Sequence, residues 1–477
     1  MLKVMLIYPL PRLERKPGPK WLPLGLSYLA SALQKEGHEV IIFDRYASAG
    51  LFGPDKKTIN SFMLDKVNQF KPDLIGFNTV TPLIFDTVDC AALIRNEFKG
   101  PIIAGGHHAT ALPELTLTKI PELDGVIQGE GENAIRRLAS GENPLTIEGV
   151  WWREGNKISG SPPVQIDDLD NLPFPDMSLL DMDFYTRPSR TAIRAHYLSV
   201  ASIITSRGCT QNCDFCAESL TYGRGVRTHS ADYVLEWINK ILYDYPIEAL
   251  YFLDNDFLVD RERALIISEK LIQSGLNQKI KFAIQTRVNR IDPEILAILK
   301  RAGCTLLELG IEAFSQGHLD FVHKGTSVDL NVKALEMCRK AGIPAHAYMI
   351  MGFKGETMAD LEQRLHWLKK ASNHFTISLS MLSMYPGTRL YQKNGNSFFE
   401  SNPWTEEEIS NYFLKDHFST ISAADRARWL KNEYAAEWRR RNRRAILRYN
   451  PPYKLLRFAL DKLKSSSKQR ALKIFGK

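Results

Sequence analysis

The sequence has few cysteines and no long apolar segment. Six of its 477 residues are cysteine, and three of these, Cys209, Cys213 and Cys216, lie within eight residues. This clustering differs from a disulfide framework and fits a reducing compartment, so we expect a cytoplasmic protein. No apolar run approaches the roughly 18 residues that a membrane span needs. The apolar start runs into a Pro-rich turn without a cleavage site, so no signal peptide is expected.

Positive charge is scarce outside the C-terminal end. The net charge is +8, but residues 424–477 contain seventeen Lys or Arg against four Asp or Glu, so the remainder carries −5. The segments 423–448 and 454–464 predict basic helices with apolar and aromatic residues, which suit an anionic membrane surface at the inner side of the membrane. Simple packing of a basic end on the preceding domain is the alternative. Nucleic acid competes for the same charges but is disfavoured, because aliphatic side chains outnumber aromatic ones.

Short apolar segments alternate with helical ones through the first 140 residues, which predicts an α/β fold with an open parallel, Rossmann-like sheet. The expected strands are 3–8, 39–43, 73–77, 101–104 and 124–127. Such sheets bind ligands at the carboxyl ends of their strands. No G-x-G-x-x-G motif follows the first strand, which disfavours a dinucleotide. The candidate ligand-binding residues after the strands are Thr79, Gly105, Gly106, His107, Gly129 and Glu130.

A second series of strands and helices follows a Pro- and Asp-rich connector that opens with an expected hairpin at 149–160. Strands are expected at 198–205, 249–253, 280–285, 305–311, 345–351 and 376–381. Six such units predict a partial TIM-like (β/α)6 barrel, whose catalytic groups gather at the carboxyl ends of the strands. We therefore expect a ligand-binding domain at 1–140, a connector at 141–196, a barrel at 197–390 and a helical basic region at 391–477.

The cysteine cluster has the spacing C-x3-C-x2-C. Thiolates are soft ligands that suit iron–sulfur clusters, zinc or Cu(I). A structural zinc site uses four protein ligands, and ferredoxin-type runs supply a fourth cysteine that is missing nearby. The spacing therefore favours a cluster with one iron open to a small molecule, and a three-cysteine zinc site is the alternative.

This loop, with Phe215 before the last cysteine, resembles the signature of the radical S-adenosylmethionine (SAM) superfamily. In that family three cysteines hold a 4Fe–4S cluster, SAM chelates the fourth iron, and its reductive cleavage yields a 5′-deoxyadenosyl radical. The resemblance implies an electron donor such as flavodoxin or ferredoxin. SAM presents an ammonium, a carboxylate, a ribose and an adenine. The residues expected to meet these groups are Phe215, Asp254, Asp256, Gln285, Arg287, Glu312, Gly352 and Gly355.

The first 140 residues resemble the cobalamin-binding domain of one large radical SAM subgroup. The matching stretches are 21–26, 105–110 and 128–132. The D-x-H-x-x-G motif, whose histidine ligates cobalt in many cobalamin enzymes, is absent. The lower face of cobalamin is therefore not expected to be held by that histidine. Either His107 or His108 could approach the corrin, or both are ordinary loop residues.

The resemblance implies a cobalamin-dependent radical SAM enzyme that methylates an unactivated carbon. The alternatives are a non-methylating oxidative cyclase of the magnesium-protoporphyrin ester type and a non-catalytic iron–sulfur redox protein. A nucleic-acid-modifying enzyme is a further option. The expected substrate is a small molecule, and the basic tail hints at a lipid, isoprenoid or tetrapyrrole.

Overall fold

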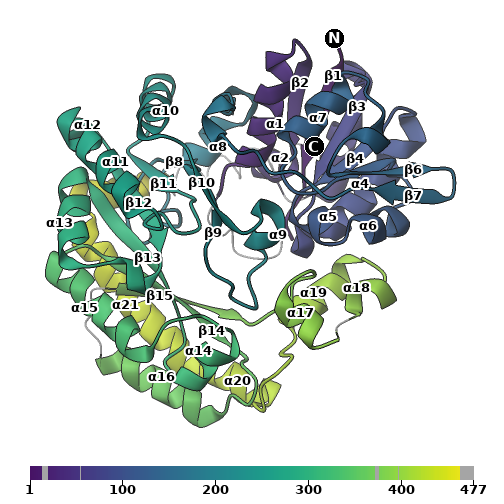
Figure 1. Ribbon diagram of the computed structural model, residues 1–477. Helices are drawn as coiled ribbons and strands as arrows, with labels where there is room; N and C mark the ends of the chain where they lie inside the picture. Colours follow the sequence, from purple (N-terminus) through teal and green to yellow (C-terminus); the bar gives the residue numbers. More distant parts are fainter. Residues whose placement is uncertain (13–19, 54, 371–374, 396, 462–477) are drawn as a thin grey trace.

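The computed structural model describes residues 1–12, 20–53, 55–370, 375–395 and 397–461 (Figure 1). Within these ranges two sheets of mainly parallel strands, each flanked by helices, stand side by side with a short ribbon between them. The predicted α/β class is confirmed. No helix in the described ranges combines the length and the apolar character that crossing a membrane requires.

The first sheet has seven strands in the order β2-β1-β3-β4-β5-β6-β7. Its strands are β1 (Lys3–Tyr8), β2 (Glu39–Asp44), β3 (Leu74–Asn78), β4 (Ile102–Gly105), β5 (Gly125–Ile127), β6 (Val150–Glu154) and β7 (Lys157–Gly160). β1 to β5 are parallel, and the positions of all five predicted strands are confirmed within a residue or two. The hairpin β6–β7, predicted inside the connector, pairs antiparallel with β5 and extends this sheet.

Helices cover both faces of the first sheet. α1 (Leu24–Lys35) and α7 (Glu132–Ala139) share a core with one face, because their apolar residues recur every three or four positions. The helices that contribute to the core of the other face are α3 (Lys56–Phe70), α4 (Ile84–Glu97) and α6 (Pro113–Lys119). The shorter α2 (Arg45–Phe52) and α5 (His107–Ala111) follow β2 and β4 directly. The carboxyl ends of the strands stay uncovered by these layers, which leaves room for a ligand there.

The second sheet has six parallel strands in the order β15-β14-β13-β12-β11-β8. They are β8 (Val200–Ile203), β11 (Ala249–Phe252), β12 (Lys281–Thr286), β13 (Cys304–Glu312), β14 (Ala345–Met351) and β15 (Phe375–Met381). The sheet curves into an open half-barrel (Figure 1). Each of the six predicted strands is confirmed.

Helices lie outside the half-barrel. They are α10 (Ala231–Asp244), α11 (Arg261–Gln273), α12 (Leu276–Lys279), α13 (Pro293–Ala302), α14 (Gln316–Phe321), α15 (Val328–Ala341) and α16 (Met358–Lys370). Four of these helices begin after N-caps, Ser230, Asp260, Asp292 and Ser327, whose side chains accept a hydrogen bond from the backbone amide three residues later. Local sequence therefore sets where these helices begin.

A short ribbon carries the cysteines. β9 (Ser206–Cys209) pairs antiparallel with β10 (Gly225–Thr228), and α9 (Glu218–Tyr222) lies between them in the chain. The sequence predicted that the cysteine loop follows the first barrel strand, β8. It follows β9 of this ribbon instead. Gly208 has φ +92°, and a Cβ there would lie 2.2 Å from the carbonyl oxygen of Gly225. The close crossing thus requires glycine.

Buried ion pairs fasten this ribbon to the first sheet. Arg207 of β9 donates to Glu130 at 2.9 Å and to Glu132 at 2.6 Å, beside the start of α7. Arg227 of β10 donates to Glu130 at 2.6 Å and to the carbonyl of Ile166. We call these four charged residues the ribbon clamp. It couples the loop that bears the cysteines to the end of β5.

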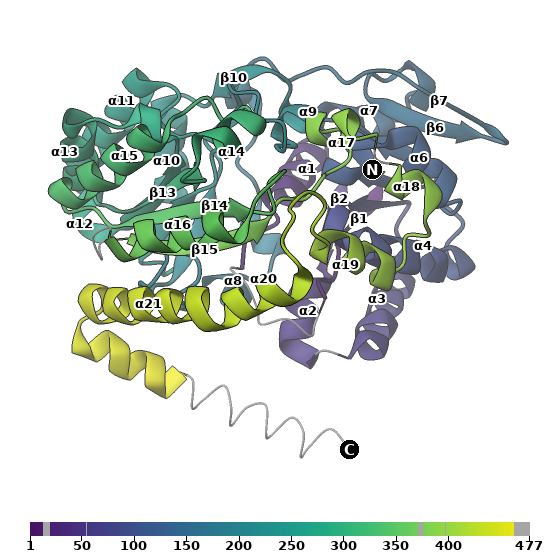
Figure 2. The ribbon, with the colours of Figure 1, turned by 90° about the horizontal axis from the view of Figure 1, so that it is seen from below.

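The C-terminal region returns across both sheets (Figure 2). Its helices are α17 (Arg389–Lys393), α18 (Phe398–Ser401), α19 (Glu406–Leu414), α20 (Ala423–Trp429) and α21 (Ala435–Tyr449). α18 and α19 add Phe399 and Tyr412 to the core of the first sheet, whereas α21 packs along β15. The predicted long helix at 423–448 is confirmed, with a π-helical turn at Leu430–Tyr434.

The basic tail packs on the barrel over much of its length. Arg441 is fully buried and donates to Glu437 and to the carbonyls of Leu368 and Phe375. Residues 452–461 form a further helix, in which Lys454 pairs with Glu248 at 2.9 Å. The rest of the predicted amphipathic segment, from 462 onward, lies outside the described residues.

Replacing Arg441 with Ala should destabilise the barrel. The change leaves the Glu437 carboxylate and two carbonyls short of donors, so we expect a loss of about 3 kcal/mol in the free energy of unfolding. Urea titration followed by circular dichroism measures it. Arg443→Ala, which removes an exposed guanidinium two residues away, is the matched control. An equal loss in both variants would contradict the prediction.

Glu130→Gln should destabilise the protein in a pH-dependent way. Burial raises the pKa of Glu130, but the bonds from Arg227 and Arg207 outweigh it and hold the pKa below its ordinary value of 4.5. The stabilisation is then complete above about pH 4.5 and is lost as the pH falls through the lower, folded-state pKa. We expect E130Q to lower the melting temperature at pH 7. The difference in melting temperature from wild type should shrink as the pH falls. A difference in melting temperature that stays constant down to pH 3 would refute this prediction.

Candidate active site

The three clustered cysteines border one cavity at the mouth of the half-barrel. Cys209 ends β9, and Cys213 and Cys216 lie in the loop before α9, all three partly exposed. The cavity, of about 210 Å³, is also lined by Phe215 and Gln285. Burial raises the pKa of the Cys209 thiol. It also raises the pKa of the Cys216 thiol, to about 12. A bound cation therefore has to displace their protons, as thiolate ligation requires.

Arg287 and a buried lysine shape the wall beside Cys213. Arg287 donates to the Cys213 sulfur at 3.7 Å and to the carbonyl of Lys324. Lys324 pairs with Glu312 at 2.6 Å, and both side chains are less than a tenth exposed. Glu312 has φ +58°, a conformation that non-glycine residues seldom adopt outside functional sites. The predicted residues Gln285, Arg287 and Glu312 thus meet at the cavity, and Lys324 is a participant that sequence reasoning missed.

Two predicted carboxylates do not reach the cavity. Asp254 is fully buried and accepts hydrogen bonds from Thr205 and Ser206, which tie the end of β11 to the ribbon. Asp256 is buried and accepts from Thr286 at 2.7 Å. Asn255, which lies between them in the turn after β11, lines the cavity instead. The assignment of both aspartates to SAM is therefore corrected to a structural role.

The Gly352–Gly355 turn also lies away from the cavity lining. A Cβ at Gly352 would lie 2.6 Å from the Met381 sulfur and 3.3 Å from Asp416. The amide of Gly355 donates to the carbonyl of Phe418. The returning C-terminal segment thus packs against this turn, an arrangement that residue order alone did not indicate. Glu218 and Ser219 of α9 line the cavity and were not predicted either.

A second cleft lies at the carboxyl ends of β1, β3, β4 and β5. Its volume is about 300 Å³, and six glycines contribute backbone to a wall that is otherwise largely apolar. The lining includes Gly25, Gly76, Gly105, Gly106, Gly129 and Gly131, with Asn78, His107 and Glu130. Where glycines form the wall, a large flat ring system can come close to the backbone. The residues present therefore fit a corrin.

The predicted residues of this cleft divide into two groups. Gly105, Gly106, Gly129, Glu130 and His107 line it. Thr79 does not: it is buried, and its hydroxyl donates to the carbonyl of Gly105 and accepts from the amide of Ala109. The carboxylate of Glu130 is engaged by the ribbon clamp, so its part in the cleft is to position the ribbon.

The two adjacent histidines point to different places. His107 is hydrogen-bonded to Thr221 of α9 at 2.8 Å and borders the cleft. His108 is fully buried beside Phe399 and Trp404, and burial lowers its pKa to about 3. The option that His108 approaches a corrin is therefore wrong, because its ring lies in the core that the C-terminal helices complete.

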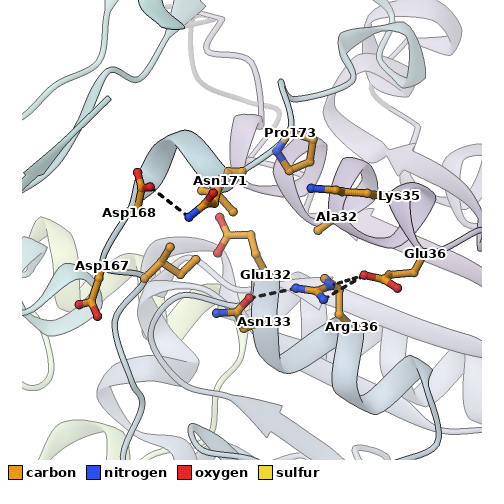
Figure 3. A pocket seen from close by; sticks show the side chains of 12 residues that line it. Ala32, Lys35, Glu36, Glu132, Asn133, Arg136, Asp167, Asp168, Asn171 and Pro173 are labelled. Carbon is orange, nitrogen blue, oxygen red and sulfur yellow. Dashed lines mark hydrogen bonds and ion pairs between the residues drawn. The ribbon is translucent and has the colours of Figure 1, made fainter. Parts of the chain in front are cut away.

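Another hollow, of about 390 Å³, lies outside both sites, between α1, α7 and the connector (Figure 3). Two pairs of its polar groups bind each other: Arg136 pairs with Glu36 at 2.9 Å, and Asn171 donates to Asp168 at 3.1 Å. Charges of both signs are mixed there and no cysteine is near. Its side chains offer no chemistry comparable to that of the thiol-lined cavity.

Comparisons with known proteins agree with this geometry. The profile of the radical SAM superfamily matches residues 203–368, and that of the B12 binding domain matches residues 14–139. An uncharacterized methyltransferase of Pyrococcus horikoshii is 32% identical over 400 residues, which cover 82% of this chain and 83% of the relative. The anaerobic magnesium-protoporphyrin IX monomethyl ester cyclase of Cereibacter sphaeroides is 26% identical over 78% of this chain and 60% of the relative.

A solved structure shares the whole architecture. The radical SAM methyltransferase TsrM from Kitasatospora setae, with cobalamin and a [4Fe-4S] cluster bound, superposes with a TM-score of 0.69 at 17% identity. The match covers 93% of this chain and 99% of that one. This structure shows the shared fold, and the two profile matches with the 32% identical methyltransferase show that the chain belongs to the cobalamin-dependent methyltransferase family of the radical SAM superfamily; it is an enzyme whose cofactors are a 4Fe–4S cluster, SAM and cobalamin.

Proposed function

We propose that this enzyme methylates an unactivated carbon of a small-molecule substrate that sits between the thiol-lined cavity and the glycine-lined cleft. One observation carries the proposal: α9 borders both spaces. Glu218 and Ser219 line the cavity, whereas Thr221 and Tyr222 line the cleft. A helix of five residues is about 7.5 Å long. Groups held in the two spaces thus approach the same substrate from two sides.

The roles of the chain's own residues follow from their placement. Cys209, Cys213 and Cys216 hold the cluster, and Phe215, Asn255, Gln285, Arg287 and Glu312 surround SAM. When bound, the cluster and SAM supply a carbon radical that removes hydrogen, and cobalamin supplies the methyl group. The partly buried walls keep water away from that radical. The ribbon clamp holds the cysteine loop beside the cleft, so the two reacting groups keep a constant separation.

A ring-forming oxidative reaction is the second candidate, because an anaerobic cyclase is among the relatives. Both reactions start with hydrogen removal and differ in whether a methyl group reaches the product. Methyl-labelled SAM separates them once a substrate is in hand, since only methylation leaves label in the product. An external one-electron donor of the flavodoxin or ferredoxin type is part of the proposal. So are domain divisions at residues 196 and 390, whereas the first domain extends past residue 140, because the hairpin β6–β7 belongs to its sheet.

Cys213→Ala should abolish reductive SAM cleavage. The change removes one of the three thiolates that would hold the cluster, so one iron loses its protein ligand. We expect no 5′-deoxyadenosine from anaerobically reconstituted protein with SAM and dithionite, measured by chromatography, together with a loss of bound iron. Cys338→Ala, in the buried core of α15, is the control and keeps both. Cleavage that survives in C213A would overturn the enzyme assignment.

Gly25→Leu should block the cleft without disturbing the fold. Gly25 is exposed on α1 and lines the cleft, and a Cβ there meets no atom within 4 Å. Leucine is also the better helix former. Titration with hydroxocobalamin, followed by absorbance, should show affinity weakened by about tenfold or more, equivalent to about 1.4 kcal/mol.

Gly317→Leu is the matched control for this experiment. It places the same side chain on α14, exposed and outside both spaces. Wild-type corrinoid affinity in G25L would mean that cobalamin does not occupy this cleft.

A further inference from the structure

The helix α21 packs on the half-barrel with one side and turns the other side to solvent. Its buried residues recur every four positions and so form one stripe along the helix: Glu437, Arg441 and Ala445. Residues two positions further on lie on the opposite side of an α-helix. That side carries Arg439, Arg443 and Leu447, all of them exposed. The outer stripe of α21 is therefore basic, with an apolar residue near its end.

The helix at 452–461 is apolar on its outer side. Its inner side is held to the barrel by Lys454, which pairs with Glu248, and by Phe458, whose ring packs on Tyr197. The outer side carries three large side chains that are 66%, 62% and 48% exposed: Tyr453, Leu456 and Leu460. Single apolar residues on a surface are ordinary, whereas a group of them rimmed by polar residues marks an interaction site.

The charge around these apolar side chains has one sign. Residues 438–460 include eight basic residues and no acidic one. Arg441 and Lys454 turn inward. The exposed arginines that form no ion pair within the described ranges are Arg439, Arg443 and Arg444. We call these three, with Leu447, Tyr453, Leu456 and Leu460, the outer tail face; both helices lie along one margin of the molecule (Figure 2).

We propose that the outer tail face docks the enzyme on an anionic lipid bilayer. Helices that lie in a membrane surface insert apolar side chains at the boundary between head groups and acyl chains. Their arginines reach the phosphates of the head groups with the charged end of a long, apolar stem. Anionic lipids attract such basic groups over a short distance. The outer tail face supplies both components on adjacent helices.

Two other partners match this face less well. A second copy of the chain, related by a two-fold axis, would bring the same surface against itself and set arginine against arginine. Nucleic acid would pair the arginines with phosphates. It would leave Leu447, Leu456 and Leu460 in water, because phosphate contacts bury no aliphatic side chain. A lipid surface accommodates the charge and the leucines together.

Sedimentation with vesicles measures the docking. The full chain, reconstituted with its cluster and cobalamin, is mixed with vesicles of phosphatidylcholine alone or of phosphatidylcholine with phosphatidylglycerol. We expect binding to the vesicles that contain phosphatidylglycerol, and this binding should weaken as salt rises, because salt screens the arginines. Vesicles of phosphatidylcholine alone should bind about tenfold more weakly.

Two double variants separate the charge from the apolar contact. Arg443→Ala with Arg444→Ala removes two charges, each expected to contribute about fivefold to the affinity for anionic vesicles. Leu456→Ser with Leu460→Ser should weaken binding about tenfold, because these side chains then no longer enter the bilayer. The matched controls remove exposed side chains from the outer helices of the barrel and should keep wild-type affinity: Arg301→Ala with Lys333→Ala, and Ile266→Ser with Leu330→Ser.

Several results would overturn this docking. Wild-type protein that binds neither type of vesicle, or both equally, is one. Without vesicle binding, a polynucleotide affinity lost with the arginines would assign the face to nucleic acid, and a dimer lost with the leucines would assign it to a second copy. Vesicle binding that appears only after deletion of residues 462–477 would assign the face to that segment. SAM cleavage is measured on the same samples, so failure of docking is distinguished from failure of the proposed function.

Discussion

The ribbon clamp is the interaction on which the rest of the molecule depends. Arg207 lies two residues before Cys209, and its guanidinium reaches the two glutamates beside the end of β5. Replacing a buried ion pair with apolar residues is often neutral for stability, so the clamp is better understood as a device for position. It fixes a cysteine-bearing loop, which has little core of its own, against the wall of a separate sheet.

Two parallel sheets with uncovered carboxyl ends face this ribbon from opposite sides. Each sheet provides a ligand space at that end, as parallel α/β architectures commonly do. The returning C-terminal helices then complete the cores: Phe399 and Trp404 pack on the first sheet, and Arg441 anchors α21 to the second. The basic character of the tail thus serves packing in part, as the buried Arg441 and the Lys454–Glu248 pair illustrate.

The polar interior of the half-barrel complements this arrangement. A barrel core is usually filled by branched apolar side chains, whereas here Glu308, Tyr251, Tyr348 and Arg194 occupy it. Apolar residues close the space on the other sides, among them Ile193 and Leu306. The lumen thus holds buried, hydrogen-bonded polar groups next to a cavity lined largely by polar residues.

The sequence by itself determined the secondary-structure elements and pointed to the cysteine motif. The strands, the capped helix starts and the C-x3-C-x2-C spacing all depend on neighbours within a few residues, so local patterns reveal them. The tertiary structure decided which polar residues share a space. Asp254 is buried whereas Asn255 lines the cavity, and Thr79 holds β3 to β4 through a hydrogen bond to Gly105. Lys324 and Glu308, which lie far from the cysteines in the chain, line the same cavity. The direction of a side chain at a strand end depends on register and on what packs against it, and no local pattern carries that information.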